Sequence, residues 1–365
     1  MSVQPFILPE LPPEIDYSSL LMKIVAARDA VVRYDEAMKK LLNPNIVQRS
    51  IRTKEAVLSS RIEGTQVTLD EVFLLDAREE VDEHTQKQMD YREVFNYREA
   101  LQRGKELLEK KPLGENVIKE LHNILLNSVR GKNRRPGQFR IDQVWIGRPG
   151  ASKEQASFIP VAPGEIQRLF SNLEKFLHTE QGIDPIVQIG IAHYQFEAIH
   201  PFSDGNGRVG RLMIPLFLYE KGVTALPNIF ISEYLEENRE EYYLRLKEVS
   251  TKGRWEEWIS FFLDAVIEQT KRTHAVVEKI EKLHRNLHER SHTFHSRYAD
   301  AFIDALFQAP HFRVNQIQKI SRIRNHQTLY SLIEKFVDAK ILVDATPDIN
   351  RNKIYVFRDL LKIIA

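Results

Sequence analysis

The chain has 365 residues, with 52 Lys and Arg against 51 Asp and Glu, so its formal net charge is +1. The absence of cysteine excludes disulfide frameworks, thiolate zinc sites and cysteine nucleophiles. The near-zero net charge provides no global field for a polyanion, so nucleic-acid binding would require a local basic patch. The length favours two or three domains.

Turn-forming residues are scarce, with 15 Gly and 16 Pro, which favours long helices over many short strands. No run approaches the roughly 18 apolar residues of a membrane span, so we expect no membrane partner. The N-terminus lacks a basic segment followed by a long apolar run, the pattern of a signal peptide. These features predict a cytoplasmic protein.

The N-terminal third is predicted to be helical. Four prolines in residues 1–15 favour an extended arm. Apolar residues at spacings of three and four predict a helix over 17–42 and a second over 44–62, which ends before Gly64. Another helix begins at Thr68, where an acid three residues later gives the spacing of a capping box.

Two further helices, over 82–111 and 115–129, precede a change of periodicity. Residues 131–164 are rich in glycine and proline around two β-prone runs, 143–146 and 157–159. This pattern predicts a β-hairpin with a loop at its tip.

Helical patterning resumes at residue 165 and continues to about residue 290, with breaks near Gly182 and at 200–206. The last 70 or so residues form a separate pattern of three helices followed by two strands. This order is typical of a winged helix-turn-helix, a DNA-binding architecture. The predicted helices are 298–308, 314–321 and 327–339, and the predicted strands are 341–344 and 353–357.

Residues 200–211, with the sequence HPFSDGNGRVGR, concentrate chemically useful groups between two apolar helical runs. His200 precedes a proline, so it is expected to end the first helix and project from the loop. The glycines allow close backbone approach to a ligand, and the N-terminus of the next helix provides an anion site. Arg208 and Arg211 lie on one face of that helix and can reach the same anion.

This arrangement indicates phosphate binding beside a base. Asp204 offers a carboxylate to a Mg²⁺ ion between phosphates. His200 is expected to titrate near neutrality, as histidine usually does, and to accept a proton from a hydroxyl group. The residues therefore favour transfer of a nucleotide or phosphoryl group to an alcohol, whereas the DGNG turn alone would equally suit a solvated helix start.

The segment resembles the signature HPFxDGNGRxGR of the Fic family at every position. The resemblance implies an all-α, mostly helical Fic fold with a small β-hairpin flap, and transfer of AMP from ATP to a hydroxyl side chain of a target protein. It implies His200 as general base, Phe202 as the loop anchor and Asp204 as the Mg²⁺ ligand. It also implies an anion hole from Gly205, Asn206 and Gly207, with Arg208 and Arg211 on the β- and γ-phosphates.

Residues 59–64, SSRIEG, resemble the family's inhibitory motif [S/T]xxxE[G/N], which begins at Ser59. The resemblance implies that Glu63 pairs with Arg211 and blocks productive placement of the ATP γ-phosphate. A carboxylate in a guanidinium fork competes with phosphate for the same donors. The plain alternative for Glu63 is an ordinary residue at a helix C-terminus.

The resemblance also suggests roles for two further features, and a third feature invites a separate reading. The hairpin at about 140–160 corresponds to the flap that positions an extended stretch of the target. Asn238, in a charged helix, is expected to face the adenine, although such a residue is usually only solvated. His193 lies two helical turns before His200, but no HExxH spacing accompanies it, so we expect no zinc site there.

The expected domains follow from these patterns. The C-terminal residues 311–365 carry ten Lys and Arg against five Asp and Glu. Arg322, Arg324 and His326 precede the third helix, and Arg351 and Lys353 lie on the expected wing, where they could contact DNA phosphates. The expected divisions are an N-terminal region 1–110 with the inhibitory helix at 44–64, a Fic core 111–275, a helical connector 276–294 and a winged helix 295–365.

Alternatives to an autoinhibited adenylyltransferase remain open. The winged helix could serve a DNA-binding regulator that uses the Fic core as a nucleotide sensor, or it could act in dimerisation or protein docking. Other members of the family transfer a different phosphate-linked group, or remove AMP with the inhibitory glutamate. The sequence does not name the target protein, and it leaves a homodimer open.

Overall fold

The computed structural model describes residues 4–41, 43–78, 85–127, 134–147, 152–179, 182–349 and 351–365. The chain divides into two compact units, and helices α1, α2, α4 and α11 each contribute residues to both. The first unit comprises Met1–Asp35, Leu58–Thr65 and Phe95–Lys271, and the second comprises Glu36–Val57, Gln66–Val94 and Arg272–Ala365.

The long helices have the positions that the apolar periodicity predicts. The helix predicted over 17–42 is a short 3-10 turn, Tyr17–Leu20, followed by α1. The capping box of the third helix is confirmed by hydrogen bonds between Thr68 and Glu71 in both directions, at 2.8 and 3.3 Å. The bounds are α1 (Leu21–Lys40), α2 (Asn45–Ile62), α3 (Leu69–Arg78), α4 (Gln86–Leu108), α5 (Glu115–Leu125) and α6 (Ile166–His178).

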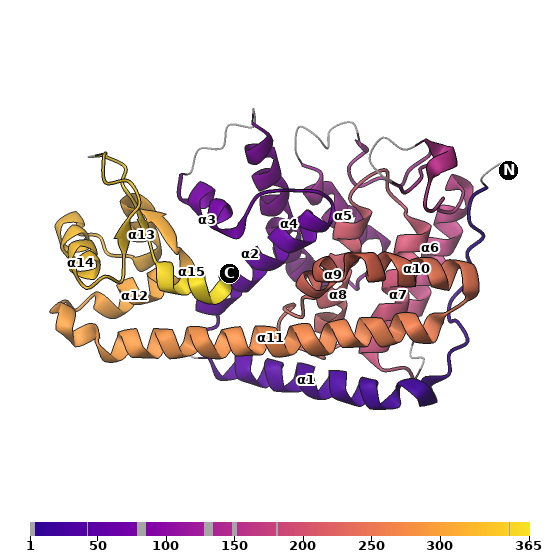
Figure 1. The fold of residues 1–365 in the computed structure, drawn as a ribbon, viewed down its shortest axis with the longest axis horizontal. Coiled ribbons are helices and arrows are strands. Elements are labelled where there is room, and N and C mark those ends of the chain that lie inside the picture. The colour runs from indigo at the N-terminus through magenta and orange to yellow at the C-terminus, as the bar shows by residue number, and fades with distance from the viewer. Residues whose placement is uncertain are drawn as a thin grey trace. The chain divides into compact units, whose positions relative to one another are not determined.

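The helix pair α7 (Pro185–Ile199) and α8 (Asn206–Glu220) forms the centre of the first unit, and the two helices lie side by side in Figure 1. Thirteen of the 15 residues of α7 are buried, because other elements surround the helix on all sides. Asp184 caps it by accepting a hydrogen bond from the Ile186 N–H at 2.8 Å. The loop between α7 and α8 is therefore attached to two rigid helices.

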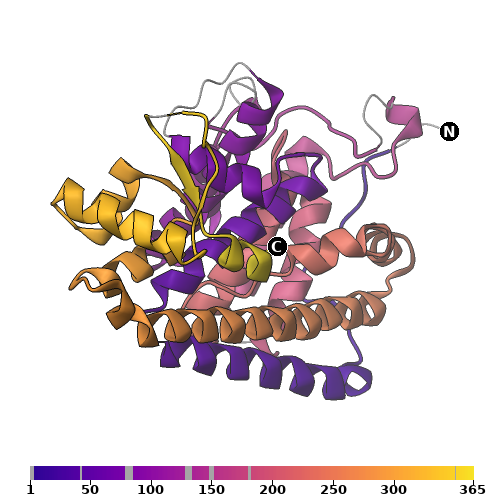
Figure 2. The same ribbon diagram turned by 60° about the vertical axis from the view of Figure 1, so that its left-hand side comes forward.

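The helix α11 (Trp255–Glu289) packs against this centre. The indole of the fully buried Trp258 donates a hydrogen bond to the Gly190 carbonyl of α7 at 2.9 Å. A Cβ on Gly190 would lie 2.9 Å from the ring of Phe262, so only glycine permits this approach. Lys23 of α1 bonds Ser260 of α11 at 2.7 Å, and both views show the two helices running together here (Figures 1 and 2).

The second unit ends in a small sheet flanked by helices. Three antiparallel strands have the order β1-β3-β2, and α3 packs on β1. The core of this part includes Phe302, Phe312 and Phe336, which are fully buried. The elements are α12 (Ala299–Gln308), β1 (His311–Arg313), α13 (Val314–Ser321), α14 (His326–Asp338), β2 (Val343–Asp344), β3 (Ile354–Val356) and α15 (Arg358–Ile364).

The structure corrects several expected elements. The pattern missed β1 and α15, which are only three and seven residues long. The helices predicted over 82–111 and 115–129 are shorter, since α4 begins at Gln86 and α5 ends at Leu125. The expected connector from residue 276 is helical, as predicted, and it continues the helix that begins at Trp255, because α11 extends to Glu289.

The two predicted hairpin runs, 143–146 and 157–159, do pair in antiparallel fashion, but within the described residues they form a single bridge, between Ile146 and Phe158, in place of regular strands. Hydrogen-bond partners outside the hairpin explain this: the Ile159 carbonyl accepts from the N–H of Phe6 in the extended N-terminal arm, and Pro160 has no N–H to donate. Residues 148–151 of the expected tip lie outside the described part of the chain.

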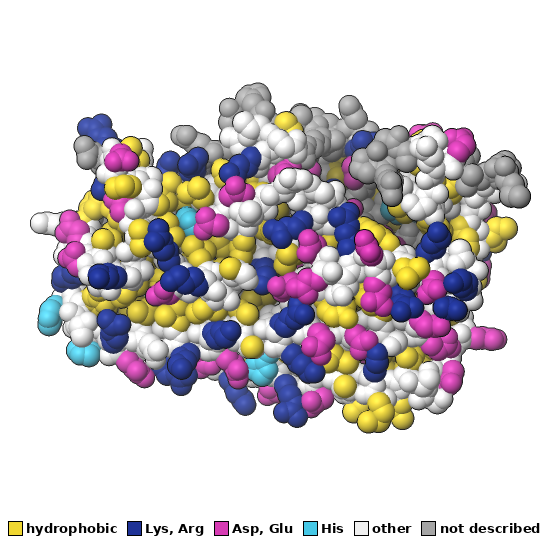
Figure 3. Space-filling model, in the orientation of Figure 1, with side chains coloured by type: hydrophobic (Ala, Val, Ile, Leu, Met, Phe, Trp, Pro, Cys, Tyr) yellow, Lys and Arg dark blue, Asp and Glu magenta, His cyan; other side chains and the backbone are white. Residues whose placement is uncertain are grey.

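Figure 3 shows basic and acidic side chains interspersed over one face, in keeping with the near-zero net charge. Within the described residues, no helix is long and apolar enough to cross a membrane.

Candidate active site

The loop between α7 and α8 begins and ends with a residue in the left-handed backbone region. His200 has φ 49° and ψ 62°, and its N–H closes α7 by donating to the Phe196 carbonyl at 2.9 Å. The expected break at this residue is therefore confirmed. Gly205, with φ 77°, precedes the first turn of α8. A left-handed histidine costs about 1–2 kcal/mol, which the surrounding contacts must offset.

Phe202 is fully buried and anchors the loop in the core. The side chain of Asn206 accepts from the Phe202 N–H and donates to the Phe202 carbonyl, both at 2.9 Å. The side chain of Asn206 therefore clamps the loop, and its backbone stays available for the expected anion hole.

Replacing Asn206 by alanine is expected to lower the free energy of unfolding by about 2–4 kcal/mol, because two buried backbone groups of Phe202 lose their partners. Urea titration of the full chain measures this. Asn238→Ala is a matched control, since its amide makes a single hydrogen bond to the Tyr234 carbonyl. Equal losses in the two variants would contradict the clamp.

His122 of α5 supports the same loop, and sequence reasoning missed it. Its ring stacks on Phe202 with centroids 3.7 Å apart and planes 8° from parallel. The Gly137 N–H donates to Nδ1 at 2.9 Å, so the ring proton is on Nε2, which donates to the Asp204 carbonyl at 3.0 Å. Burial lowers the pKa of His122 to about 4, so the ring remains neutral.

One contact orients the ring of His200, and another holds its backbone. Its Nδ1 lies 3.3 Å from the Glu197 carbonyl, which can only accept, so Nδ1 carries the proton and Nε2 has the free lone pair. Burial lowers the pKa of His200 to about 4. The guanidinium of Arg140, also missed from the sequence, donates to the His200 carbonyl at 2.8 Å and to the Val161 carbonyl at 2.6 Å. His200 is thus a neutral, fixed proton acceptor.

Arg211 of α8 is buried and bound to the end of α2. Its Nε donates to the Ser59 hydroxyl at 2.8 Å, and its Nη2 donates to the Ser59 carbonyl at 3.0 Å and to Glu63 Oε1 at 2.6 Å. Burial opposes ionisation of Glu63, but Arg211 outweighs it and lowers the pKa of the carboxyl. A Cβ on Gly207 would lie 2.1 Å from Glu63 Oε1, so the carboxylate lies directly on the first turn of α8.

Asp204 lies at the outer edge of the loop with its side chain 46% exposed. Its Oδ1 accepts from the Gly205 N–H at 2.6 Å and lies 3.7 Å from Nη2 of the buried Arg208. Its Oδ2 lies 3.8 Å from Arg134 Nε. A half-exposed carboxylate thus stands beside two guanidinium groups and the amide end of a helix.

Two matches to known domains cover this region. Residues 21–106 match the Fic/DOC family N-terminal domain, and residues 112–218 match the Fic/DOC family domain, which together span more than half of the chain. The chain belongs to the Fic/DOC family.

Named relatives match a shorter stretch of this Fic chain. "Protein adenylyltransferase fic-1" of Caenorhabditis briggsae is 32% identical over 141 residues, which are 36% of this chain and 25% of that protein. "Protein adenylyltransferase Fic" of Culex quinquefasciatus is 34% identical over 130 residues, 35% of this chain and 23% of that protein. The match spans about a quarter of the length of these relatives.

Solved Fic structures share the fold. The Fic family protein from Desulfovibrio desulfuricans has a TM-score of 0.62 and 22% identity, covering 95% of this chain and 98% of that one. Fic-1 of Caenorhabditis elegans (residues 134–508) has a TM-score of 0.54 and 21% identity, covering 70% and 72%. The mostly helical Fic fold expected from the motif is therefore correct.

A second carboxyl group, that of Glu197 on α7, lies close enough to Arg211 to feel its charge. Glu197 Oε1 would lie 2.5 Å from a Cβ on Gly210, and this buried oxygen has no hydrogen-bond partner among the described residues. Burial raises the pKa of Glu197 to about 8, although the charge of Arg211 opposes the shift. Glu197 is therefore mainly protonated at neutral pH, so that Glu63 is the carboxylate that neutralises Arg211 among the described residues.

The side chains of Asn238 and His193, two residues singled out from the sequence, make their hydrogen bonds to other parts of the fold. The side-chain amide of Asn238 donates to the Tyr234 carbonyl at 2.9 Å and makes no hydrogen bond to the Fic loop within the described residues. His193 is fully buried, with its Nε2 2.9 Å from the Tyr242 hydroxyl. His193 is therefore part of the packed core of the Fic fold.

Lowering the pH from 7.5 to 5.5 is expected to reduce the free energy of unfolding by a net of about 1–2 kcal/mol. Burial lowers the pKa values of His122 and His200 to about 4 and that of His193 to about 3. Below about pH 6.5 the unfolded chain therefore takes up protons that the folded chain does not, which lowers stability by about 4 kcal/mol. Burial raises the pKa of Glu197 to about 8, so the folded chain takes up this proton before the unfolded chain does, which restores about 2–3 kcal/mol. Urea titrations at both pH values measure the net loss, and His122→Phe should reduce it by about 1 kcal/mol. An unchanged loss would contradict the burial argument.

Proposed function

We propose that this chain transfers AMP from ATP to a hydroxyl side chain of a target protein and releases pyrophosphate. The main support is a convergence: the proton acceptor His200 lies beside the amide end of α8, which also carries Arg208 and Arg211. The N-terminus of a helix, with its unpaired N–H groups, is suited to bind phosphate groups. The names of the two relatives, both protein adenylyltransferases, support the same reaction.

His200 would act as the general base. The target oxygen attacks the α-phosphorus of ATP while its proton passes to Nε2 of His200. The bond from the α-phosphorus to the oxygen that bridges the β-phosphate breaks, and pyrophosphate leaves. The hydrogen bond from Nδ1 to the Glu197 carbonyl keeps the basic nitrogen directed outward, and a pKa of about 4 keeps it unprotonated at neutral pH.

The phosphates would be held by the first turn of α8 and its arginines. The N–H groups of this turn and the helix dipole favour negative charge. Asp204 fits a Mg²⁺ ion, because its carboxylate is 46% exposed and Mg²⁺ typically takes one or two carboxylates together with phosphate oxygens and water. When bound, the ion would neutralise phosphate charge, while Arg208 and Arg211 would fix the orientation of the triphosphate.

Glu63 would inhibit the enzyme by occupying Arg211. The bond between the two is short, 2.6 Å, and it is charge-assisted, so a phosphate must displace the carboxylate to use the same donor. Ser59 strengthens the inhibited arrangement by accepting from Nε of Arg211. All of these contacts lie within one chain, which supports inhibition in cis.

The residues 140–160 would form the surface for the target. In the described part of this segment, Ile141 is 68% exposed and Trp145 is 46% exposed, so apolar side chains are available to an extended peptide. The backbone of such a peptide would pair with the segment, and its hydroxyl would lie near His200. The target would be defined by shape and backbone more than by one side chain.

Incubating the Glu63→Gly variant with Mg²⁺ and ATP labelled at either the α- or the γ-phosphate tests the proposal. Label on the protein or a partner is expected from the α-position and not from the γ-position, because pyrophosphate leaves. Transfer of γ-label would mean phosphoryl transfer. Label from CTP or UTP alone would contradict transfer of AMP, and loss of a preformed AMP group would favour removal of AMP.

For residues 295–365 we propose a winged helix that binds DNA. The order α12, β1, α13, α14, β2, β3 supports this fold. Arg322 and Arg324 are exposed just before α14, and His326 is exposed as its first residue. Lys353 is bound to Asp344 at 2.7 Å, so it is a weaker candidate for a phosphate contact. Gel shifts across a salt series would test binding, since phosphate contacts weaken steeply with salt. Absence of any salt-sensitive shift would favour protein docking.

A further inference from the structure

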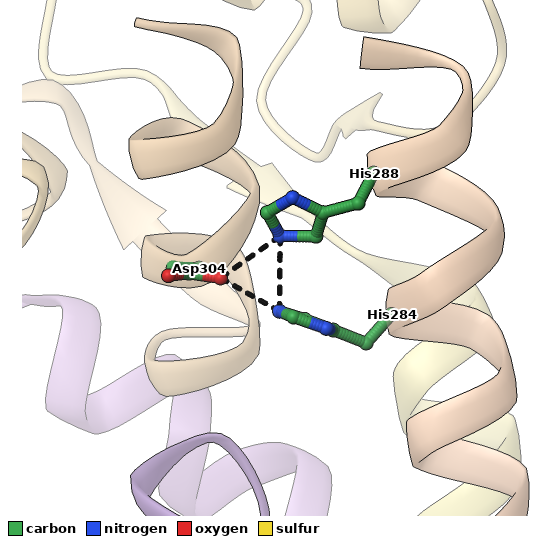
Figure 4. Close-up of side chains that lie close together, drawn as sticks. All are labelled: His284, His288 and Asp304. Atoms are coloured by element: carbon green, nitrogen blue, oxygen red, sulfur yellow. Dashed lines mark hydrogen bonds and ion pairs between the residues drawn. The ribbon is translucent and has the colours of Figure 1, made fainter. Parts of the chain in front are cut away.

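Two histidines and an aspartate converge in the second unit, away from the residues of the Fic loop in sequence. His284 and His288 are four residues apart on α11, hence on one face, and Asp304 lies on α12 (Figure 4). Asp304 Oδ1 is 2.6 Å from Nε2 of His284 and 3.0 Å from Nε2 of His288, and the two nitrogens are 3.1 Å apart. Three ligand atoms therefore face one point.

Asp300, one turn before Asp304, determines which nitrogen of His288 carries a proton. Its Oδ1 lies 2.9 Å from Nδ1 of His288. A carboxylate accepts, so Nδ1 is the donor, and in the neutral ring Nε2 presents its lone pair to His284 and Asp304. A histidine held by a carboxylate through one nitrogen and facing a cation through the other is a recurrent arrangement at metal centres.

Hydrogen bonds alone satisfy this triangle poorly. A lone pair on His288 Nε2 repels the Asp304 carboxylate, and protons on both Nε2 atoms would face each other at 3.1 Å. A cation among the three atoms resolves both conflicts. Zinc bonds of about 2.0–2.2 Å in tetrahedral geometry place ligand atoms about 3.3 Å apart, so the side chains need to separate by less than about 1 Å.

We infer that His284, His288 and Asp304 bind a divalent transition-metal ion of the zinc class. Two imidazoles and one carboxylate favour zinc, cobalt, nickel or copper over magnesium or calcium, which prefer oxygen ligands. The chain has no cysteine, so nitrogen and oxygen donors are its only means of holding such an ion.

The surroundings suit a bound ion that retains a water ligand. The side chains of His284, His288 and Asp304 are 17%, 28% and 36% exposed, so solvent reaches the fourth position. The ring of Phe307 contacts His284 edge to face at 5.0 Å and limits its rotation. Because the ligands come from α11 and α12, the ion cross-links the end of the long helix to the first helix of the C-terminal part.

Titration of the untagged full chain with Co²⁺ alone tests the site. We expect one equivalent to bind with a visible absorption band, which added Zn²⁺ removes by competition. His284→Gln combined with His288→Gln should abolish the band, and circular dichroism would verify that the variant is folded. Asp300→Asn should weaken binding roughly 10- to 100-fold, the usual effect of losing a carboxylate behind a ligand histidine.

The matched control is His292→Gln, which changes a nearby exposed histidine whose Nδ1 lies 3.0 Å from the Glu289 carbonyl. This variant should retain the Co²⁺ band. Binding of Co²⁺ by the double variant as tightly as by the parent would overturn the assignment, and so would the absence of stoichiometric binding by the folded parent. Since the readout is metal binding itself, its failure is independent of any transfer reaction.

Discussion

Replacing His200 by alanine in the Glu63→Gly background is expected to reduce transfer of α-labelled AMP by about 10²- to 10⁴-fold, the range for loss of a general base. The geometry supports a specific role: Nδ1 is held by the Glu197 carbonyl, so Nε2 is the only nitrogen able to accept the target proton. Initial rates at saturating ATP and Mg²⁺ measure the loss.

The matched control for this variant is His178→Ala, which removes an exposed histidine in the last turn of α6. It should leave the rate unchanged. The pH profile provides a second readout. Because burial lowers the pKa of His200 to about 4, its protonation should not reduce the rate between pH 8 and about pH 5. A rate that halves near pH 6.5, or a His200→Ala variant with full activity, would contradict the assignment.

Replacing Glu63 by glycine is expected to raise the rate of AMP transfer by roughly 10- to 100-fold. The bond that Glu63 accepts from Arg211 is charge-assisted, and such bonds contribute about 1.5–3 kcal/mol. Removing it frees the guanidinium for a phosphate. Parallel rates of self-labelling and of ATP binding by calorimetry measure the effect. Glu63→Gln should give an intermediate gain, since the neutral amide keeps the size of the side chain and loses its charge.

Arg61→Gly controls for the change in helix stability, because it puts the same glycine into the last turn of α2 and keeps the carboxylate. This variant should remain inhibited. Ser59→Ala removes the acceptor of Arg211 Nε and should release part of the inhibition. Equal activation by Arg61→Gly and Glu63→Gly would mean that loosening of α2, and not loss of the ion pair, raises the rate.

The predictable part of the site is the part that is contiguous in sequence. The residues from His200 to Arg211 could be found because a proline, two glycines and a helix start determine the local backbone wherever they occur. His122, Arg140 and Glu197 were missed for the opposite reason. Each is an ordinary residue in its own segment and acquires a role only through a contact with the loop or with Arg211.

The same distinction explains the fold. Long helices with a marked apolar period were predicted within a few residues, because their pattern and caps are local. The strands of the hairpin at 140–160 were predicted too long, since the Ile159 carbonyl is paired with Phe6 near the N-terminus of the chain and the two runs share a single bridge. The strand β1 is three residues long and depends on β3 for its hydrogen bonds, so no local sequence pattern predicts it.

By itself the sequence determined the family, the helical architecture and the set of reactive groups, because these depend on residue types at short spacing. The tertiary structure decided their chemical state. Burial makes His200 a weakly basic neutral acceptor with a pKa of about 4 and raises the pKa of Glu197 to about 8. Folding also brings the end of α2 onto α8, so that Glu63 occupies Arg211. Protonation and pairing follow from desolvation and distance, which only the folded chain defines.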